Sequence, residues 1–230
     1  GLWSTAPLVA ALLSRRPRPR CAELGAADRA YFLEAAKKTW AFFSTFAGSE
    51  DHGLPPDNYQ EGRVPRAAHR TSPTNIGMGL VSTLAAHDLG FIDAAEVSAR
   101  VGAALEAVEG MEKCEGHLYN WYDTRSLAPL WPRYVSTVDS GNLAGALVAV
   151  AVGLREMGLT ELAERASALE ARMGFGFLYN ARRKLLSLGY RAADGEGPGR
   201  LDATDYDMLA SEARLASFLA IAKGDVPEAH

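Results

Sequence analysis

Residues 140–157 read SGNLAGALVAVAVGLREM, and this segment decides the expected fold because it carries no charge before Arg155. A helix that is apolar on every side is buried inside a protein. Two further segments, 73–89 and 207–223, have nearly the same character. The starts of the three segments, at 73, 140 and 207, are spaced by 67 residues. The sequence therefore predicts three buried inner helices at a fixed period.

A helix of a different kind precedes each inner helix. Apolar residues recur at helical spacing along a charged background, which predicts one buried face and one solvated face. These outer helices are expected at 28–46, 94–113 and 160–173. Alternation of outer and inner helices indicates a repeat of helical hairpins. We expect an all-α fold, either an open solenoid or an inner ring of helices surrounded by an outer ring.

The connections into the inner helices favour the ring. They are long, at 48–72, 115–139 and 174–206, and they are rich in aromatic and charged residues. Long loops on one face of a repeat commonly line a functional site. We therefore predict a toroid, of which three hairpins make half of a six-hairpin ring, with short β-hairpins in the loops.

The middle connection has the composition of a sugar-binding surface. Residues 117–145 read HLYNWYDTRSLAPLWPRYVSTVDSGNLAG, in which aromatic rings alternate with carboxylates, amides and arginines. Flat rings can stack on the CH-rich face of a pyranose, and the polar groups can bind its hydroxyls. The alternative is a hairpin whose aromatic residues only pack on their neighbours.

Composition excludes several classes of function. The formal net charge is −4, which gives no electrostatic footprint for nucleic acid. The two cysteines are far apart in sequence, so reduced thiols are expected. The five histidines form no metal-binding motif. We expect neither a metal nor a cofactor.

The first residues differ from the remainder. An apolar stretch, LWSTAPLVAALLS, is followed by RRPRPR at 15–20. It is too short to span a bilayer. It is either the end of a longer spanning helix, with the arginines on the cytoplasmic side, or a poorly ordered tail. The expected organisation is a linker tail over 1–25 and a helical domain over 26–230.

Five motifs resemble consecutive motifs of one known family. They are DHGLPPDNYQE (51–61), AHRTSPTNIG (68–77), GHLYNWYDT (116–124), RYVSTVDSGNLAG (133–145) and DYDMLASEARLASFLAIAKGD (205–225). The chain from residue 40 onward resembles the glucoamylase-like central domain of cyclic β-1,2-glucan synthases, which is related to endo-β-1,2-glucanases.

The resemblance implies an (α/α)6 barrel that acts on β-1,2-glucan by retaining transglycosylation. It also implies a parent protein with spanning helices in a bacterial inner membrane, and this domain on the cytoplasmic side. The family pattern continues past residue 230, so we expect the N-terminal half of the barrel, inactive alone and self-associating through its unpaired edges.

Cleavage or transfer of a glycoside needs two carboxyl groups at the scissile bond. Glu212 is the candidate acid/base, because SEARLASF resembles the family's catalytic segment. On the predicted helix Glu212 shares a face with apolar residues (Met208, Leu215 and Leu219), which would favour its protonated form. The alternative is a buried glutamate paired with an arginine. The resemblance implies a nucleophile outside this chain, with Asp139 as a weaker local alternative. Asp139 is more readily interpreted as a helix N-cap that also contacts substrate.

The remaining candidates for substrate contact lie in the connections. Tyr59, Trp121 and Tyr122 are the expected stacking platforms, and Asx turns are the alternative role for Asp57 and Asp123. The full set is Asp57, Asn58, Tyr59, Glu61, His69, Arg70, Asn75, Asn120, Trp121, Tyr122, Asp123, Asp139 and Asn142. Thr71 or Ser72 is expected to cap the helix that starts at Pro73. Two rival functions remain, an inverting endo-β-1,2-glucanase and a non-catalytic carbohydrate-binding module.

Overall fold

The computed structural model describes residues 5, 9–11, 24–64, 66–195, 197–208 and 210–230. By their internal contacts the residues form two compact units, Gly1–Ala35 and Ala36–His230. The tail predicted over 1–25, with its apolar and arginine-rich stretches, lies almost entirely outside the described residues. The predicted boundary after residue 25 stays a prediction.

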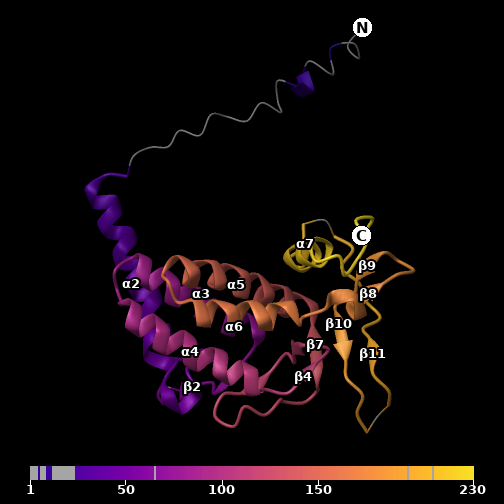
Figure 1. Ribbon diagram of the computed structural model, residues 1–230, viewed down its shortest axis with the longest axis horizontal. Coiled ribbons are helices and arrows are strands. Elements are labelled where there is room, and N and C mark those ends of the chain that lie inside the picture. The colour runs from indigo at the N-terminus through magenta and orange to yellow at the C-terminus, as the bar shows by residue number, and fades with distance from the viewer. Residues whose placement is uncertain (1–4, 6–8, 12–23, 65, 196, 209) are drawn as a thin grey trace. The chain divides into compact units, whose positions relative to one another are not determined.

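Six long helices are present among the described residues, at the places where the sequence predicts helices. They are α2 (Ala26–Phe46), α3 (Pro73–Asp88), α4 (Ala94–Gly110), α5 (Thr137–Glu156), α6 (Thr160–Ala171) and α7 (Arg214–Ala222). The predicted inner helices contact one another, α3 with α5 and α5 with α7 (Figure 1). The predicted outer helices α4 and α6 also contact one another, and they pack on α3 and α5. About half of the chain is helical.

Side-chain caps fix the starts of the first two inner helices. Ser72 caps α3, because its hydroxyl accepts the N–H of Asn75 at 3.2 Å, and Pro73 occupies the first helical position as predicted. Ser136 caps α5 and accepts the N–H of Asp139 at 3.3 Å. Helix α5 therefore starts three residues earlier than predicted. The prediction that Asp139 is the N-cap is wrong, and Asp139 lies inside the first turn.

The third inner helix begins at Arg214 rather than at residue 207, so the predicted period of 67 residues does not hold. The Ser211 hydroxyl accepts the N–H of Ala213 at 3.2 Å, and its carbonyl accepts the N–H of Arg214 at 3.1 Å. Such local bonds compete with helix formation. The side chain of Met208 is exposed, so it supplies little of the packing that stabilises an additional helical turn.

Helix α5 is the centre of the core. By length and composition it could cross a membrane, but 56% of its most apolar window is buried inside the protein, and this packing accounts for its composition. Glycines set the closest helix contacts. A Cβ atom on Gly141 would lie 2.6 Å from the Cβ of Ala216 in α7, and one on Gly77 of α3 would lie 2.9 Å from the Cβ of Ala146. The backbones of α3 and α7 can approach α5 this closely only because both positions are glycine.

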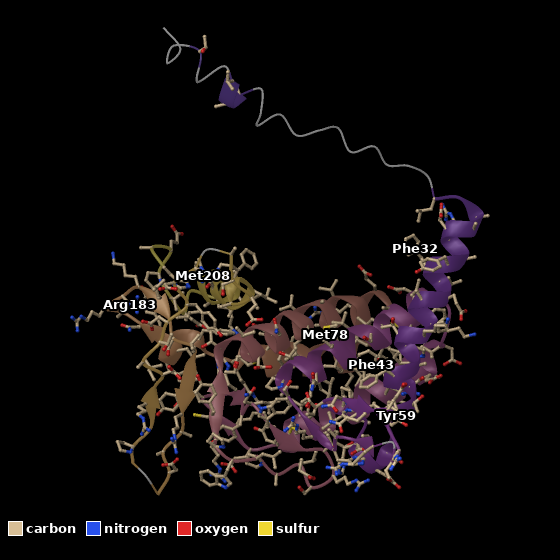
Figure 2. The ribbon with its side chains drawn as sticks, turned by 180° about the vertical axis from the view of Figure 1, so that it is seen from behind. Phe32, Phe43, Tyr59, Met78, Arg183 and Met208 are labelled. Atoms are coloured by element: carbon tan, nitrogen blue, oxygen red, sulfur yellow. The ribbon has the colours of Figure 1, made fainter. Side chains whose placement is uncertain are left out.

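The composition of the inner helices predicts burial on all sides, but the structure does not bury them completely. Each leaves an apolar strip exposed, and we call these residues the apolar face: Met78, Val148, Val152, Leu215 and Phe218 (Met78 is labelled in Figure 2). A groove of about 350 Å³ runs along part of this face between α3 and α5. Each of these apolar helices thus packs on its neighbours and presents a further side to solvent.

Short antiparallel strands lie in the connections, as predicted. The pairs are β1 (Tyr59–Gln60) with β2 (Arg66–Ala67), β3 (Arg70–Thr71) with β6 (Tyr122–Asp123), β4 (Lys113–Cys114) with β5 (His117–Leu118) and β8 (Tyr179–Asn180) with β9 (Leu185–Leu186). A three-stranded sheet has the order β11 (Arg200–Leu201), β10 (Gly189–Arg191), β7 (Tyr134–Ser136). The β3–β6 pair joins the first connection to the second, and β7–β10 joins the second to the third. The three connections are therefore hydrogen-bonded to one another.

A buried histidine anchors the second connection to the third. His117 is fully buried, and its Nε2 donates to the carbonyl oxygen of Gly174 at 3.0 Å. The rings of Phe175 and Phe177 lie 5.0 Å and 5.2 Å from the imidazole. Burial lowers the pKa of His117 from 6.5 to about 4. The folded protein thus holds this imidazole neutral at neutral pH.

This burial predicts a pH dependence of stability. In the unfolded chain His117 takes up a proton below pH 6.5, whereas in the folded chain it does so only near pH 4. Protonation therefore favours the unfolded chain in that window, and the free energy of unfolding should fall by roughly 3 kcal/mol as the pH drops from 6.5 to 4. Urea unfolding at several pH values measures the loss. In His117→Gln, which retains an N–H donor, the part of the pH dependence that comes from protonation of His117 should vanish. Equal pH dependence in both proteins would contradict this assignment.

Candidate functional site

The first turns of two inner helices are joined by side-chain hydrogen bonds. Thr74 of α3 donates its hydroxyl to Oδ1 of Asp139 in α5 at 2.6 Å. Asn142, one turn further along α5, donates its Nδ2 to the Thr74 hydroxyl oxygen at 3.0 Å. All three side chains are partly exposed. Two of them, Asp139 and Asn142, are sequence candidates, and the structure brings them together through Thr74, which the sequence analysis missed.

The second connection continues this chain of contacts. With its amide nitrogen facing Asp139, Asn120 donates to Oδ2 of that carboxylate at 2.9 Å. The Asn120 oxygen then accepts the indole N–H of Trp121 at 3.2 Å. Asp139 thus receives hydrogen bonds from both α3 and the second connection. Its carboxylate is oriented by two donors, and Trp121 is held beside it.

Residues of the first connection extend this series of side-chain contacts beyond Trp121. The guanidinium of Arg70 lies 4.6 Å from the centre of the Trp121 ring and donates to Oδ2 of Asp57 at 2.8 Å. Asn58 donates to the same oxygen at 2.9 Å. We call this continuous set of residues the polar strip: Asp57, Asn58, Arg70, Trp121, Asn120, Asp139, Thr74 and Asn142. It joins amides, carboxylates, a guanidinium and an indole, which are the groups that bind sugar hydroxyls and pyranose faces.

A second polar cluster lies between the first two connections. Asp51, which is buried, accepts hydrogen bonds from Nδ1 of His69 at 2.9 Å and from the hydroxyl of Thr124 at 2.5 Å. Nη2 of Arg125 lies 3.0 Å from Nε2 of His69. A guanidinium can only donate, so Nε2 of His69 accepts from Arg125, and Nδ1 donates to Asp51. His69 therefore ties two connections together, and its acceptor nitrogen is already occupied.

Three other candidates lie apart from these clusters. The ring of Tyr59 stacks on Phe46 with centroids 4.5 Å apart and stays partly exposed (both Tyr59 and α2 can be followed in Figure 2). Glu61 lies in the exposed turn between β1 and β2. Asn75 gives its backbone N–H to the cap of α3, and its side-chain Nδ2 is buried without a hydrogen-bond partner. None of the three contacts the polar strip by a hydrogen bond among the described residues.

Tyr122 and Asp123 have structural roles. Tyr122 is fully buried, and its hydroxyl donates to the carbonyl of Glu112, so the prediction of a stacking platform there is wrong. Neighbouring residues of a strand point to opposite sides, which turns Tyr122 inward while Asp123 of the same strand stays partly exposed. Oδ1 of Asp123 accepts the N–H groups of Ser126 at 2.8 Å and Arg125 at 3.0 Å, an Asx turn. The Ser126 hydrogen bond holds the pKa of Asp123 below its usual value.

Glu212 does not occupy the apolar environment predicted for it. It lies in the turn before α7 and is exposed, because the helix starts after it. It lines a pocket of about 470 Å³ together with Asp207, Met208 and Tyr206. Burial raises the pKa of Tyr206, and the carboxylates of Glu212, Asp139 and Asp202 raise it further. Tyr206, which the sequence analysis missed, therefore lies within electrostatic reach of both Glu212 and Asp139.

No group of three or more His, Cys, Asp or Glu side chains that could hold a metal ion occurs in the described part of the chain.

The polar strip predicts a specific effect on stability. Thr74→Val removes the hydroxyl that donates to Oδ1 of Asp139 and accepts from Nδ2 of Asn142, and the loss of both hydrogen bonds should cost about 1–3 kcal/mol of unfolding free energy. Thr83→Val in the same helix is the matched control. Its hydroxyl bonds only the carbonyl of Gly79, which keeps its helical N–H partner, so the loss should be smaller. Chemical denaturation measures both, and equal losses would contradict the proposed coupling.

Known proteins resemble this chain in sequence and in fold. The family model described as a protein of unknown function (DUF3131) matches residues 34–145. Cyclic β-(1,2)-glucan synthase NdvB of Rhizobium meliloti is 29% identical in an alignment that covers 100% of this chain and 12% of that protein. The chain therefore spans about an eighth of the length of this relative.

Solved structures share the fold at low sequence identity. An endo-β-1,2-glucanase mutant from Talaromyces funiculosus, in complex with β-1,2-glucan, has a TM-score of 0.71 at 14% identity over 88% of this chain and 49% of that one. The endo-β-1,2-glucanase of Chitinophaga pinensis, in complex with sophorotriose and glucose, has a TM-score of 0.63 at 16% identity over 76% and 42%. A putative glucoamylase from Bacteroides fragilis has a TM-score of 0.62 at 16% identity over 80% and 44%. The chain is thus homologous to a cyclic β-1,2-glucan synthase and shares its fold with endo-β-1,2-glucanases and glucoamylase-like proteins.

Proposed function

We propose that this chain is part of a carbohydrate-active domain that acts on β-1,2-glucan. The observation that carries the proposal is the polar strip, in which the first two connections and the first turns of α3 and α5 place hydroxyl-binding groups around the half-buried Trp121. Homology to a cyclic β-1,2-glucan synthase and the shared fold with proteins that bind β-1,2-glucan and sophorotriose support this substrate class. The strip is the expected contact surface for glucosyl units.

We propose further that the domain is a toroid of the (α/α)6 type and that about three of its six helical hairpins lie in this chain. The inner-to-inner and outer-to-outer contacts of the helices support a two-layered ring. The solved structures that share the fold are about twice as long as the aligned part of this chain. By the family resemblance, the parent protein lies in a bacterial inner membrane, with this domain on the cytoplasmic side.

In the proposed reaction the intact domain transfers β-1,2-glucan chains with retention of configuration, and Glu212 is the acid/base. Its position in the lining of the pocket that Tyr206 also lines supports this role. Asp139 is assigned to substrate contact, because Thr74 and Asn120 already donate to its two oxygens. The second carboxylate would come from the other half of the ring. Retention requires the two carboxyl groups to lie roughly 5–5.5 Å apart.

Two alternatives have observations in their favour. The fold shared with endo-β-1,2-glucanases favours hydrolysis, which in an inverting enzyme needs carboxyl groups roughly 6.5–9.5 Å apart. The exposure of Glu212 favours a non-catalytic carbohydrate-binding module. The anomer released by the parent protein, observed by NMR, separates retention from inversion, and the lack of any product identifies the binding module.

Activity is predicted to depend on residues outside these 230. The chain alone should give no measurable turnover of β-1,2-glucan, because one carboxyl group cannot perform both steps of the reaction. In the full parent protein, Glu212→Gln should lower the rate roughly 100- to 10,000-fold through loss of general acid catalysis. Glu228→Gln, a change at another exposed glutamate, is the control. Chromatography of the products measures the rate of both variants. Cleavage by the chain alone that survives Glu212→Gln would overturn the assignment.

We also propose that the isolated chain self-associates through the apolar face, with a second copy covering it. Five large apolar side chains are exposed on consecutive inner helices, and such surfaces are typically covered by a partner. Light scattering should therefore show a dimer or larger species. Val152→Glu on α5 should shift the distribution to monomer, whereas Val64→Glu, at an exposed valine in a loop, should leave it unchanged. A monomeric unmodified chain would refute this proposal.

A further inference from the structure

Trp131 lies in the second connection and is 66% exposed, and one face of its ring contacts the side chain of Arg133. The guanidinium of Arg133 lies 5.3 Å from the centre of the Trp131 ring. The same guanidinium lies 5.9 Å from the centre of the ring of Tyr119, which is buried in the core. Tyr119, Arg133 and Trp131 thus form a stack that runs from the core to the surface. We call it the aromatic stack.

The middle of the aromatic stack is fixed at several points. Nη1 of Arg133 forms an ion pair with Oε1 of Glu112 at 3.0 Å, and its backbone carbonyl accepts the N–H of Ala192 at 3.0 Å. Because Arg133 is anchored by both its side chain and its backbone, it restricts the ring that rests on it. A restricted ring loses little conformational entropy when a ligand stacks on it.

Backbone hydrogen bonds place the aromatic stack next to the polar strip. The N–H of Leu130 donates to the carbonyl of Trp121 at 2.8 Å, and the N–H of Asn120 donates to the carbonyl of Tyr134 at 2.7 Å. Trp131 therefore belongs to a short segment whose two ends are bonded to the two strip residues of this connection. The indole rings of Trp121 and Trp131 occur in the same hydrogen-bonded loop.

The surroundings of Trp131 differ from those of the exposed aromatic residue on the inner helices. Phe218 is exposed among the other apolar side chains of the apolar face. The ring of Trp131 has the guanidinium of Arg133 beside it, and that guanidinium is paired with the carboxylate of Glu112. An apolar partner would have to desolvate both charges, which is costly. A pyranose covers the ring with its CH face and offers hydroxyls that can donate to the carboxylate and accept from the guanidinium.

We propose that Trp131, with Glu112 and Arg133, forms a second sugar-binding platform that holds a glucosyl unit of a β-1,2-glucan chain beyond the units on the polar strip. The inference rests on the proposed function, because it takes β-1,2-glucan as the ligand. It goes further by assigning a separate contact that only a chain long enough to reach from the strip to the aromatic stack can use. Sophorose bound at the strip leaves Trp131 free.

Titration calorimetry of the 230-residue chain with sophorose and with long linear β-1,2-glucan tests the platform. Trp131→Ala should weaken the long glucan about tenfold, which is about 1.4 kcal/mol, and leave sophorose unchanged. Trp131→Phe should restore most of the affinity, because a ring face remains. Tyr31→Ala is the matched control, since Tyr31 is an exposed aromatic residue (72%) outside this loop. Long glucan should also change the tryptophan fluorescence of the unmodified chain, and Trp131→Phe should reduce that change to the part that Trp121 of the polar strip contributes, which sophorose alone also produces.

Each other outcome is decisive. Equal affinity of Trp131→Ala and the unmodified chain for long glucan overturns the platform and leaves the proposed function intact. Equal loss of both ligands, or no rescue by Trp131→Phe, shows that Trp131 supports the fold rather than binding a sugar. If the unmodified chain is folded by circular dichroism yet binds neither ligand, the proposed function fails, and the platform fails with it.

Discussion

The rest of the structure depends on the close packing around α5. Helices α3 and α7 contact this helix through glycine positions, and α6 packs against it as well. At Gly77 and Gly141 there is no room for a Cβ atom, so the separation between backbones is set by van der Waals contact. This spacing brings the first turn of α3 within hydrogen-bonding distance of the first turn of α5. The bond from Thr74 to Asp139 is a consequence of that packing.

The acidic residues differ in burial and in their hydrogen-bond partners, and these differences give them different roles. Asp51 and Asp205 are buried, and each has polar partners: His69 and Thr124 for the former, Asn180 and Arg183 for the latter. Asp205 therefore holds the third connection together from inside the protein. Asp139 is partly exposed and has two neutral donors, which leaves its negative charge available to a ligand. The two buried carboxylates, by contrast, bind groups inside the protein and are not accessible to a sugar.

Much of the fold and part of the site could be predicted from the sequence. Helix positions and the Ser72 cap follow from local patterns. The sequence also predicts six members of the polar strip, Asp57, Arg70, Asn120, Trp121, Asp139 and Asn142, because polar and aromatic residues gather in the connections. The errors have physical causes. The start of α7 depends on the local bonds of Ser211 rather than on charge pattern, and this one displacement moves Glu212 from a helix face to an exposed turn. Tyr122 was misjudged because composition does not show which way a strand residue faces. Thr74 and Tyr206 could not be found because their roles arise from contacts between segments distant in sequence.

The strand pairs that join one connection to the next limit how such a protein can evolve. In most helical repeat proteins each repeat satisfies its own backbone, so repeats can be duplicated or lost. Here β3 finds its partner in β6 of the next repeat, and β7 finds its partner in β10 of the one after. Removal of one hairpin would leave the backbone groups of a neighbouring strand unpaired. We therefore expect insertions to be accepted at loop tips such as the β10–β11 turn, and the number of repeats to stay constant.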